Sequence, residues 1–505
     1  MIKDNFFRNS LILTSSNFIT GVLKFLFAII LSHKLGDAGI GLYSLIMPIY
    51  DFFAVIVCGG MITAISKECS YYFNKNDIGN LHKSVKVSLV FDLIWSVIMA
   101  LILFSFSPFI CKFIIKDMRA MYSLWFICPA IIFVALSAIL KGYFYGISKV
   151  LTPSVIDIFE KAMRMIVILL IISILNLKET TKTVSVTYLA LSLGELCSFI
   201  LLFLFYKYNK KHFSKPYSIL QSGRNLLYSI LKISLPLCIN GVLTTGLFTA
   251  STLMLPQRLV YSGISHENAL ALIGKFSGMS MTIIFFPFIA VTSMSTMLIP
   301  HISENIAKKN YVLLKERFLE VINISFILGT ATMFICLSIG QNLGQLFFKR
   351  ADLAPFIKFA SLCAPFIYTS TSTFGILNGL GKQKIVLRNS LISAFLELLL
   401  IYLLAAIPKL NIYGYGISLI LTSITTLILN LYEIRKNYYI HISFYKIVIY
   451  LLLGLLTYLS LNILNTLLHN VNFYYKNFLL VILGFSMYIF LSSLLNSSKK
   501  NAAKL

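Results

Sequence analysis

The sequence predicts an all-α integral membrane protein with about fourteen transmembrane helices, built as two six-helix repeats plus two C-terminal helices. Of its 505 residues, 58% are hydrophobic and only 12% are charged, whereas soluble proteins are about 45–50% apolar and about 25% charged. The apolar residues form blocks of ~20 or more, the length with which a helix crosses ~30 Å of hydrocarbon. These blocks lack the alternation of membrane β-strands, which excludes a β-barrel.

A repeated motif supports the division into two halves. Residues 128–149 and 363–384 both begin with a Cys and a Pro, continue with Leu-Lys-Gly or Leu-Asn-Gly, and end with a Lys. Each copy lies where one hydrophobic span ends and the next begins. The copies lie six spans apart, and this even offset gives the two halves the same orientation in the membrane.

Hydropathy places the spans in order along the chain, and the connections between them are short. The predicted spans are 9–33, 40–66, 85–110, 121–142, 150–175, 184–206, 229–256, 273–299, 318–341, 354–378, 386–407, 412–432, 446–467 and 476–494. We therefore expect an N-terminal lobe with its linker over 1–228, a second lobe over 229–440, and two additional helices with a short tail over 441–505.

The basic residues indicate orientation and not nucleic-acid binding. The net charge is +25, but the Lys and Arg residues lie in short loops between spans. With the N-terminus inside, the inner segments hold about twice as many Lys and Arg residues as the outer ones, as the positive-inside rule requires. We expect a multi-pass protein of a bacterial cytoplasmic membrane with both termini in the cytoplasm, in contact with membrane lipids and with no nucleic-acid partner.

The span 150–175 carries the clearest group of charges within the membrane. Asp157, Glu160, Lys161 and Arg164 have the spacing i, i+3, i+4, i+7, which is one stripe of a helix. The spacing predicts ion pairs from Asp157 to Lys161 and from Glu160 to Arg164. Charges within a span face the bundle interior or water. The stripe therefore lines or gates a pathway, or else it is a self-neutralised stripe that only packs the bundle.

Isolated charges occur in other spans. Lys24 has no acid one helical turn away, and its candidate roles are binding an anionic headgroup or snorkelling outward. Asp51 is its candidate partner. Glu195 and Glu397 are lone carboxylates, each either an ion-coupling site or a hydrogen-bonded structural group. Asp92 is expected nearer a span end and without a special role.

Some residues at span ends and bends are also candidates. Arg258 and Lys275 flank an outer connection, where they either border the mouth of a cavity or are exposed loop charges. Five prolines within spans are expected to bend their helices: Pro48, Pro129, Pro236, Pro287 and Pro365. The last two spans carry almost no charge at mid-span and are expected to face lipid, with interfacial tyrosines at 450, 458, 474, 475 and 488.

The sequence does not indicate an enzyme. The eight cysteines have no paired spacing, so neither a disulfide framework, a metal site nor a bound cofactor is expected. The seven histidines are scattered, no Asp-x-Asp occurs, and no catalytic residues are assigned. A membrane-bound polysaccharide-synthesis enzyme would need a large outer loop or clustered catalytic groups.

The segment 36–50, Gly-Asp-Ala-Gly-Ile-Gly-Leu-Tyr-Ser-Leu-Ile-Met-Pro-Ile-Tyr, is similar to the stage V sporulation protein B family. The layout of six plus six plus two spans resembles the multidrug/oligosaccharidyl-lipid/polysaccharide exporter superfamily. Lipid II flippases of this superfamily carry Arg, two residues, Gly, two residues and Arg-Asp in the first span. Gly21 and Lys24 match that pattern, with Lys for Arg, whereas Phe18 and Phe25 depart from it.

The resemblance implies a lipid flippase acting by alternating access. Its expected substrate is an undecaprenyl-diphosphate-linked peptidoglycan precursor (lipid II) or a related polysaccharide lipid, moved from the inner to the outer leaflet in spore cortex or cell-wall synthesis. Substrate contacts would come from Lys24, Asp51, Lys161, Arg164 and Arg258, and coupling or gating from Asp157, Glu160, Glu195 and Glu397. The alternatives are a cation-coupled multidrug exporter and a scaffold. A coupling ion (H+ or Na+), cell-wall synthesis enzymes as partners, and a monomeric state are further expectations.

Overall fold

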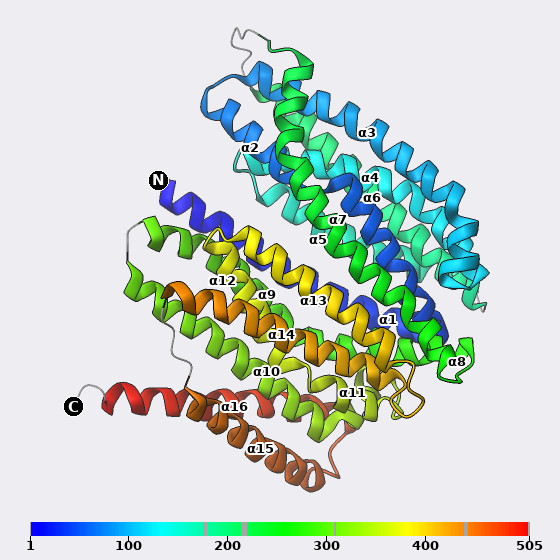
Figure 1. Cartoon of the computed structure of the whole chain (residues 1–505), viewed down its shortest axis with the longest axis vertical. Coiled ribbons are helices and arrows are strands. Elements are labelled where there is room, and N and C mark those ends of the chain that lie inside the picture. Colours follow the sequence, from blue (N-terminus) through cyan, green and yellow to red (C-terminus); the bar gives the residue numbers. More distant parts are fainter. Residues whose placement is uncertain (1, 175–178, 214–219, 308–309, 439–442, 503–505) are drawn as a thin grey trace. The chain divides into compact units, whose positions relative to one another are not determined.

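The computed structural model describes residues 2–174, 179–213, 220–307, 310–438 and 443–502, and within them the chain forms helices and no strands (Figure 1). The chain divides into two compact units. Unit 1 comprises residues 1–27 and 34–257, and unit 2 comprises residues 28–33 and 258–505. The lobe boundary expected at 228 follows the sequence repeat, whereas the division by packing falls after Gln257, so that most of the helix containing residues 229–256 packs with unit 1.

Long helices make up unit 1, to which residues 28–33 of the first and 258–261 of the last do not belong. They are α1 (Ile2–Cys58), α2 (Met61–Asn74), α3 (Ile78–Phe109), α4 (Met121–Gly146), α5 (Leu151–Ile174), α6 (Thr180–His212) and α7 (Gly223–Tyr261). A π-helical turn (Ile110–Ile115) and a short 3-10 helix (Met118–Ala120) connect α3 to α4. Helix α1 contains both of the first two predicted spans, with a kink at Gly36 between them.

The second predicted span is interrupted in the structure. Helix α1 ends at Cys58, and α2 begins at Met61 after Gly60, whose φ of 72° lies in the left-handed region that suits glycine. A Cβ added at Gly60 would lie 2.7 Å from the carbonyl oxygen of Ser234 on α7. The missing side chain therefore permits a backbone turn and a close crossing by α7 at the same point.

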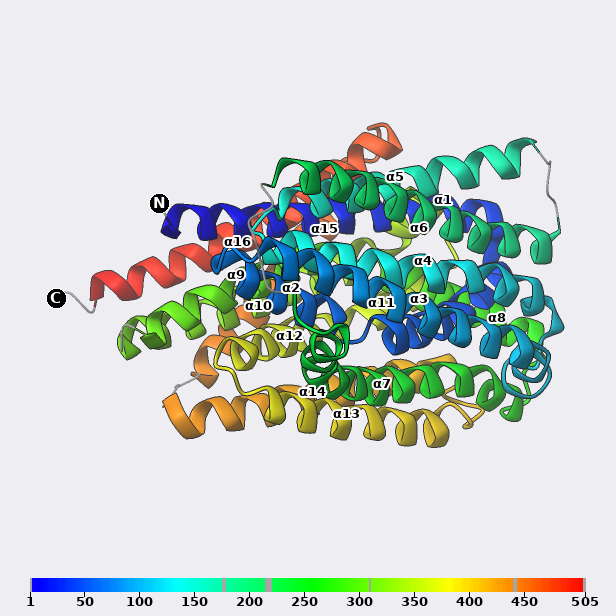
Figure 2. The same cartoon turned by 90° about the horizontal axis from the view of Figure 1, so that it is seen from above.

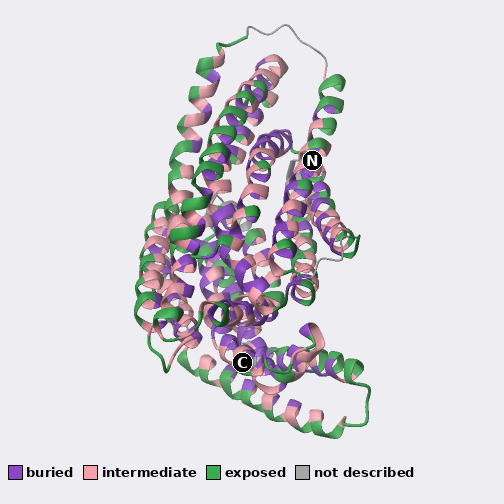
Figure 3. Ribbon diagram, turned by 90° about the vertical axis from the view of Figure 1, so that its right-hand side faces the viewer, coloured by how far each residue is buried: buried purple, intermediate pink, exposed green. Residues whose placement is uncertain are grey.

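Helix α4 is central to the packing of unit 1, where it packs against α2, α3 and α6. Its buried residues Leu140, Tyr143 and Phe144 belong to an apolar core that also includes Ile65 and Leu81. Figure 3 shows that the long helices carry buried and exposed residues along their lengths. Exposed apolar side chains suit a helix that meets lipid, which solvates them as well as a protein core does.

Unit 2 has a second set of helices. They are α8 (His266–Ile273), α9 (Met281–Ala307), α10 (Tyr311–Phe348), α11 (Ala354–Ser361), α12 (Ala364–Gly379), α13 (Gln383–Leu404), α14 (Ile412–Tyr438), α15 (Phe444–Leu467) and α16 (Phe473–Ala502). A π-helical segment (Gly274–Ser280) joins α8 to α9. Helices α13 and α14 run side by side, as Figures 1 and 2 show.

The predicted span 354–378 is two helices and not one. Helix α11 ends at Ser361, and α12 starts at Ala364 with Pro365 in its first turn. A proline is tolerated there because the first N–H groups of a helix have no intrahelical partner. Pro365 therefore begins a helix, and the expectation that it bends one is wrong.

The last two helices are anchored to unit 2 by polar contacts. Both α15 and α16 pack against α10. Tyr450 and Tyr488 are buried, at 3% and 0% exposure, so the expectation that they are interfacial is wrong. The Tyr488 hydroxyl donates to the Tyr450 carbonyl oxygen at 2.9 Å and lies 2.6 Å from the Thr330 hydroxyl, so its hydrogen bonds are satisfied inside the bundle. Tyr474 and Tyr475 are exposed.

The protein is an all-α membrane protein, as the hydropathy pattern predicts. Eleven stretches of the described helices are long and apolar enough to cross a membrane. The first of them, Leu11–Asn74, covers two predicted spans. Helix α5, with four charged residues, and the pair α11–α12, with its break, account for the remaining two spans.

Candidate functional site

A buried ion pair on α5 is the centre of the candidate site in unit 1. Glu160 and Arg164 are 2% and 8% exposed, and Arg164 Nη2 lies 2.6 Å from Glu160 Oε1. The predicted i, i+4 pair between them is confirmed. Removing one member of such a buried pair leaves an uncompensated charge and costs about 3–5 kcal/mol.

Helices α6 and α1 add further polar groups to this pair. Glu195 on α6 is 7% exposed, and its Oε1 lies 3.5 Å from Arg164 Nη2. The hydroxyl of Tyr50 on α1 donates to the same carboxylate oxygen at 3.3 Å. The guanidinium of Arg164 is thus shared by carboxylates from two helices, and three helices contribute to one network.

Gly194 makes room for the network where α5 and α6 pack together. A Cβ added at Gly194 would lie 2.9 Å from Glu160 Oε1. The absence of a side chain lets the Glu160 carboxylate occupy the surface of α6 directly beside Glu195. This role of Gly194 was not predictable from the sequence, because Gly194 and Glu160 are far apart in the chain.

The predicted pair between Asp157 and Lys161 is wrong. Asp157 Oδ1 lies 2.6 Å from Nζ of Lys141, which reaches across from α4. Lys161 pairs instead with Glu160. Helical spacing identifies which residues can meet on one helix, but a lysine on a packed neighbour competes for the same carboxylate. Lys141 lies within the repeated motif, which was the available signal for its importance.

Lys24 and Asp51 of α1 are exposed. Lys24 and Asp51 form no ion pair with each other or with other residues in the described part of the chain. Lys24 interacts at longer range with the charges of Lys161 and Arg164 and with those of Asp51 and Glu160. The expected contact between Lys24 and Asp51 is therefore not formed. The ammonium of Lys24 is exposed near the network of Glu160 and Arg164.

Glu397 belongs to unit 2. Glu397 lies half-buried on α13, and neither hydrogen bonds nor ion pairs join its carboxylate to the described residues. Its charge acts on Tyr415 of α14. A lone carboxylate in a membrane helix is a candidate for binding a cation or a proton.

A second polar network in unit 2 was missed by the sequence analysis. Asn389 on α13 donates to Asn430 Oδ1 on α14 at 2.9 Å, and Asn430 donates to Thr373 Oγ1 on α12 at 3.1 Å. Nearby, Arg388 Nη2 lies 2.8 Å from Glu433 Oε1. The available signal was the occurrence of two asparagines within predicted spans, since amides in membrane helices usually bond across helices.

Arg258 is engaged by aromatic rings at the end of α7. Its guanidinium carbon lies 3.9 Å from the ring centroid of Tyr402 and 4.9 Å from that of Tyr261. Arg258 Nε also donates to the Tyr402 carbonyl oxygen at 2.9 Å. These contacts, all within unit 2, describe a stacked cation, and a substrate role for Arg258 stays a prediction.

Lys275 belongs to an ion-pair cluster with Arg350 and Asp352, which lie between α10 and α11. Its Nζ lies 2.8 Å from Asp352 Oδ2, and Arg350 Nη2 lies at the same distance from that oxygen. Hydrogen bonds from Arg350 and Lys275 lower the pKa of Asp352 to about 2. The cluster joins the segment after α8 to the loop between α10 and α11.

Asp92 lies near the middle of α3 and not at its end, so the position expected from the sequence is wrong. It is 1% exposed, and both carboxylate oxygens lack a hydrogen-bond partner among the described residues. Burial of an ionised carboxylate without partners is costly. Unlike Glu160 and Glu195, Asp92 is therefore a buried carboxylate of unit 1 without a hydrogen-bond partner among the described residues.

The arrangement can recognise charge. The described residues contain no group of three or more His, Cys, Asp or Glu side chains placed to hold a metal ion. Arg164 sits between two acids, and its Nε is buried without a partner in the described chain. Such a network can exchange partners when helices move, while the nearby ammonium of Lys24 can meet an anion.

Comparisons with known proteins agree with a transporter. A family model described as polysaccharide biosynthesis protein matches residues 6–306, and a second model, MatE, matches residues 236–403. The chain is 24% identical over 444 residues to stage V sporulation protein B of Bacillus subtilis (strain 168), covering 86% of this chain and 85% of that protein.

Two further similarities extend the comparison. Lipid II flippase MurJ of Bacillus subtilis (strain 168) is 22% identical over 420 residues, covering 78% of this chain and 76% of that protein. The fold is similar to a solved inward-facing multidrug resistance MATE family transporter of the MOP superfamily. That structure has a TM-score of 0.66 and 13% identity, and the match covers 85% of this chain and 98% of that one.

Proposed function

We propose that this chain, which belongs to the polysaccharide biosynthesis protein family, flips an undecaprenyl-diphosphate-linked lipid from the inner to the outer leaflet. The cargo is a peptidoglycan precursor or a related polysaccharide lipid. Similarity to stage V sporulation protein B and to a lipid II flippase supports this choice among the functions of the superfamily. Both relatives are matched over most of their lengths.

The exposed ammonium of Lys24 is the observation on which the proposal depends. A charged side chain at the centre of a bilayer costs about 2.5–3.5 kcal/mol on insertion scales, so it faces water or a binding partner. Lys24 is exposed and has no ion pair among the described residues. A diphosphate brought beside Lys24 would regain in a charge-assisted contact part of the hydration that it loses.

The buried network would position and gate this site. Arg164 holds carboxylates of α5 and α6 together, and Tyr50 links them to α1, the helix that carries Lys24. A shift of α6 relative to α5 would change which acid Arg164 contacts. The network can thus couple helix movement to headgroup binding as the site is exposed alternately to the two sides of the membrane.

A cation-coupled multidrug exporter is the second candidate. The MatE model matches residues 236–403, and the fold is similar to that of a MATE transporter. Glu397 lies in the matched segment and has no partner among the described residues. In either function Glu397 is our proposed site for a coupling ion, H+ or Na+.

Cellular placement follows from the proposed cargo. The protein would act in a bacterial cytoplasmic membrane, with both termini in the cytoplasm, as a monomer beside cell-wall synthesis enzymes. A role in the spore cortex is supported by the similarity to stage V sporulation protein B. The proposal assigns no catalytic step to the chain, in keeping with its family and fold.

Reconstituted protein tests the proposal directly. Fluorescent lipid II is placed in proteoliposomes, and its transfer between leaflets is measured with and without a membrane potential, against protein-free vesicles. Protein-dependent transfer is expected, and a dependence on potential would indicate charge movement. Absence of transfer together with export of cationic dyes from cells would overturn the proposal in favour of the exporter.

A further inference from the structure

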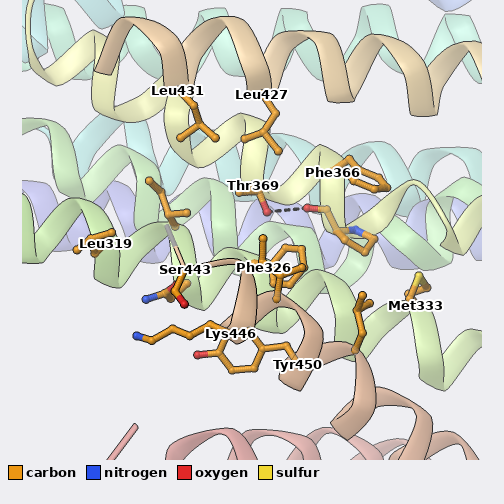
Figure 4. Close-up of a pocket in the computed structure, with 15 residues that line it drawn as sticks. Leu319, Phe326, Met333, Phe366, Thr369, Leu427, Leu431, Ser443, Lys446 and Tyr450 are labelled. Atoms are coloured by element: carbon orange, nitrogen blue, oxygen red, sulfur yellow. Dashed lines mark hydrogen bonds between the residues drawn. The ribbon is translucent and has the colours of Figure 1, made fainter. Parts of the chain in front are cut away.

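An apolar pocket of about 330 Å³ lies within unit 2 between α10, α12, α14 and α15 (Figure 4). Ligand pockets in proteins begin at about 300 Å³, so the volume is sufficient for part of a hydrocarbon chain. Most of the lining is aliphatic or aromatic and includes Leu319, Phe326, Met333, Phe366, Leu427 and Leu431.

Polar groups gather at one end of this pocket. Lys446 and Ser443 lie at the end opposite Met333 and Phe366 (Figure 4), and Asn323 also belongs to the lining. The side chains of Lys446, Ser443 and Asn323 form no hydrogen bond or ion pair with the described residues. Thr369, within the pocket, donates instead to the carbonyl oxygen of Pro365 at 2.6 Å.

Further positive charge stands beyond the polar end. Lys315 precedes Leu319 by one helical turn on α10, and Arg435 follows Leu431 by one turn on α14. Residues four apart lie on the same helix face, so both cations continue rows that line the pocket. The end of α14 and the start of α15 therefore bring a net positive charge to the polar end, whereas Lys315 at the start of α10 is balanced by neighbouring acids.

We propose that this pocket binds one anionic phospholipid, with an acyl chain against Phe326 and Met333 and its phosphate at Lys446. An apolar channel with unpaired polar groups at one end matches an amphiphile, and the surrounding cations favour a negative headgroup. The bilayer supplies such lipids. This inference goes beyond the proposed function, because Lys24 and its network belong to unit 1.

The lipid would stabilise the attachment of α15. The pocket lies between α15 and the helices before it, with Tyr450 and Leu451 on the α15 side. A chain in the pocket would bury apolar side chains from α10 and α15 together. We therefore expect anionic phospholipid to raise the thermal stability of the full-length protein as well as to bind it.

Photo-crosslinking tests this site in the full-length protein. A phosphatidylglycerol with a diazirine in its acyl chain is incorporated into phosphatidylcholine proteoliposomes, and labelled peptides are identified by mass spectrometry. Lys446→Gln removes the charge, and Leu427→Trp fills the pocket. Lys384→Gln, at an exposed lysine at the start of α13, is the matched control. Unlabelled phosphatidylglycerol, phosphatidylcholine and undecaprenyl phosphate serve as competitors.

Labelling is expected on α10, α12 and α15 near the pocket and to be displaced by unlabelled phosphatidylglycerol. Loss of one lysine contact, about 1 kcal/mol, should lower that labelling about fivefold in Lys446→Gln and leave it unchanged in Lys384→Gln. Equal labelling of both variants, labelling spread over lipid-facing helices, or better displacement by undecaprenyl phosphate would overturn the proposal. The comparison of Lys446→Gln with Lys384→Gln remains decisive even if Leu427→Trp does not fold, because Lys446 lies near the end of the pocket.

Discussion

Arg164 contributes both to the packing of unit 1 and to the proposed function. It is buried between Glu160 and Glu195, which belong to different helices. A buried ion pair adds little net stability over apolar residues of similar volume, but its removal from one side is costly. Retaining such a network in a membrane helix is therefore better explained by a role in movement or recognition than by stability.

Gly194 provides a test of the network's packing. In Gly194→Ala the new methyl would lie 2.9 Å from Glu160 Oε1 and displace that carboxylate from Arg164. Overpacking of this kind costs about 1–3 kcal/mol, so we expect a lower unfolding temperature and slower transport. Gly223→Ala is the control, because its added Cβ would meet Val87 at an ordinary 3.4 Å. Equal unfolding temperatures of Gly194→Ala and Gly223→Ala would contradict the close approach of Glu160 to Gly194.

The residues of the site were only partly predictable from sequence. Charges in otherwise apolar spans identified Lys24, Glu160, Arg164 and Glu195, because each such charge needs a specific environment. Partners on other helices were not predictable: Lys141 binds Asp157 from α4. Helical periodicity contains no information about which helices become neighbours.

Among the elements, the loop after α10 is held by ion pairs whose strength depends on pH. The pKa of Asp352 is about 2 because of Arg350 and Lys275, below the ordinary value near 3.9. This depressed pKa contributes stability above about pH 4, and the contribution is lost as the pH falls towards 2. Asp352 is 45% exposed, so solvent screening keeps the effect small.

Asp352→Asn should therefore lower the unfolding temperature of purified protein slightly at pH 6. The difference from the wild type should shrink as the pH falls below 4, since protonation then removes the same charge in the wild type. Thermal unfolding at pH 6, 4 and 3 measures this convergence. If the difference in unfolding temperature between Asp352→Asn and the wild type stays constant over this range, the ion pairs of Asp352 do not contribute to stability.

The attachment of α15 and α16 depends on asparagines of the membrane helices. Asn342 on α10 donates to Asn465 on α15 at 3.0 Å and to Asn477 on α16 at 2.8 Å. Hydrogen bonds between membrane helices average about 0.6 kcal/mol. Asn342→Ala should cost about 1 kcal/mol and speed proteolysis between α14 and α15.

Asn240→Ala provides the comparison for Asn342→Ala. Asn240 lies in α7, and its side chain makes no hydrogen bond with the described residues. Equal proteolysis rates in the two variants would mean that the asparagine contacts do not hold the last two helices. Neither the asparagine contacts nor the buried tyrosines of these helices were predicted, because apolar composition alone suggested surfaces that face lipid.

At the scale of the whole molecule, hydropathy predicted the helical membrane fold and nearly all of its spans. Length and apolarity decide whether a helix crosses a bilayer, so this information is local. Breaks within spans, such as those before α2 and α12, depend on tertiary packing and were missed. The repeat predicts two similar halves, yet unit 1 carries the charged network and unit 2 an amide network and Glu397.

The proposed function depends above all on binding of the diphosphate of a lipid cargo by the ammonium of Lys24. This binding is tested by measuring the flipping of fluorescent lipid II by Lys24→Ala, Lys24→Arg and the control Lys384→Ala, at matched protein levels in proteoliposomes. Loss of a charged contact, about 1.5–3 kcal/mol, predicts at least a tenfold fall for Lys24→Ala. Lys24→Arg should retain much of the activity, and Lys384→Ala all of it. Undiminished flipping by Lys24→Ala would show that the ammonium of Lys24 does not bind the diphosphate.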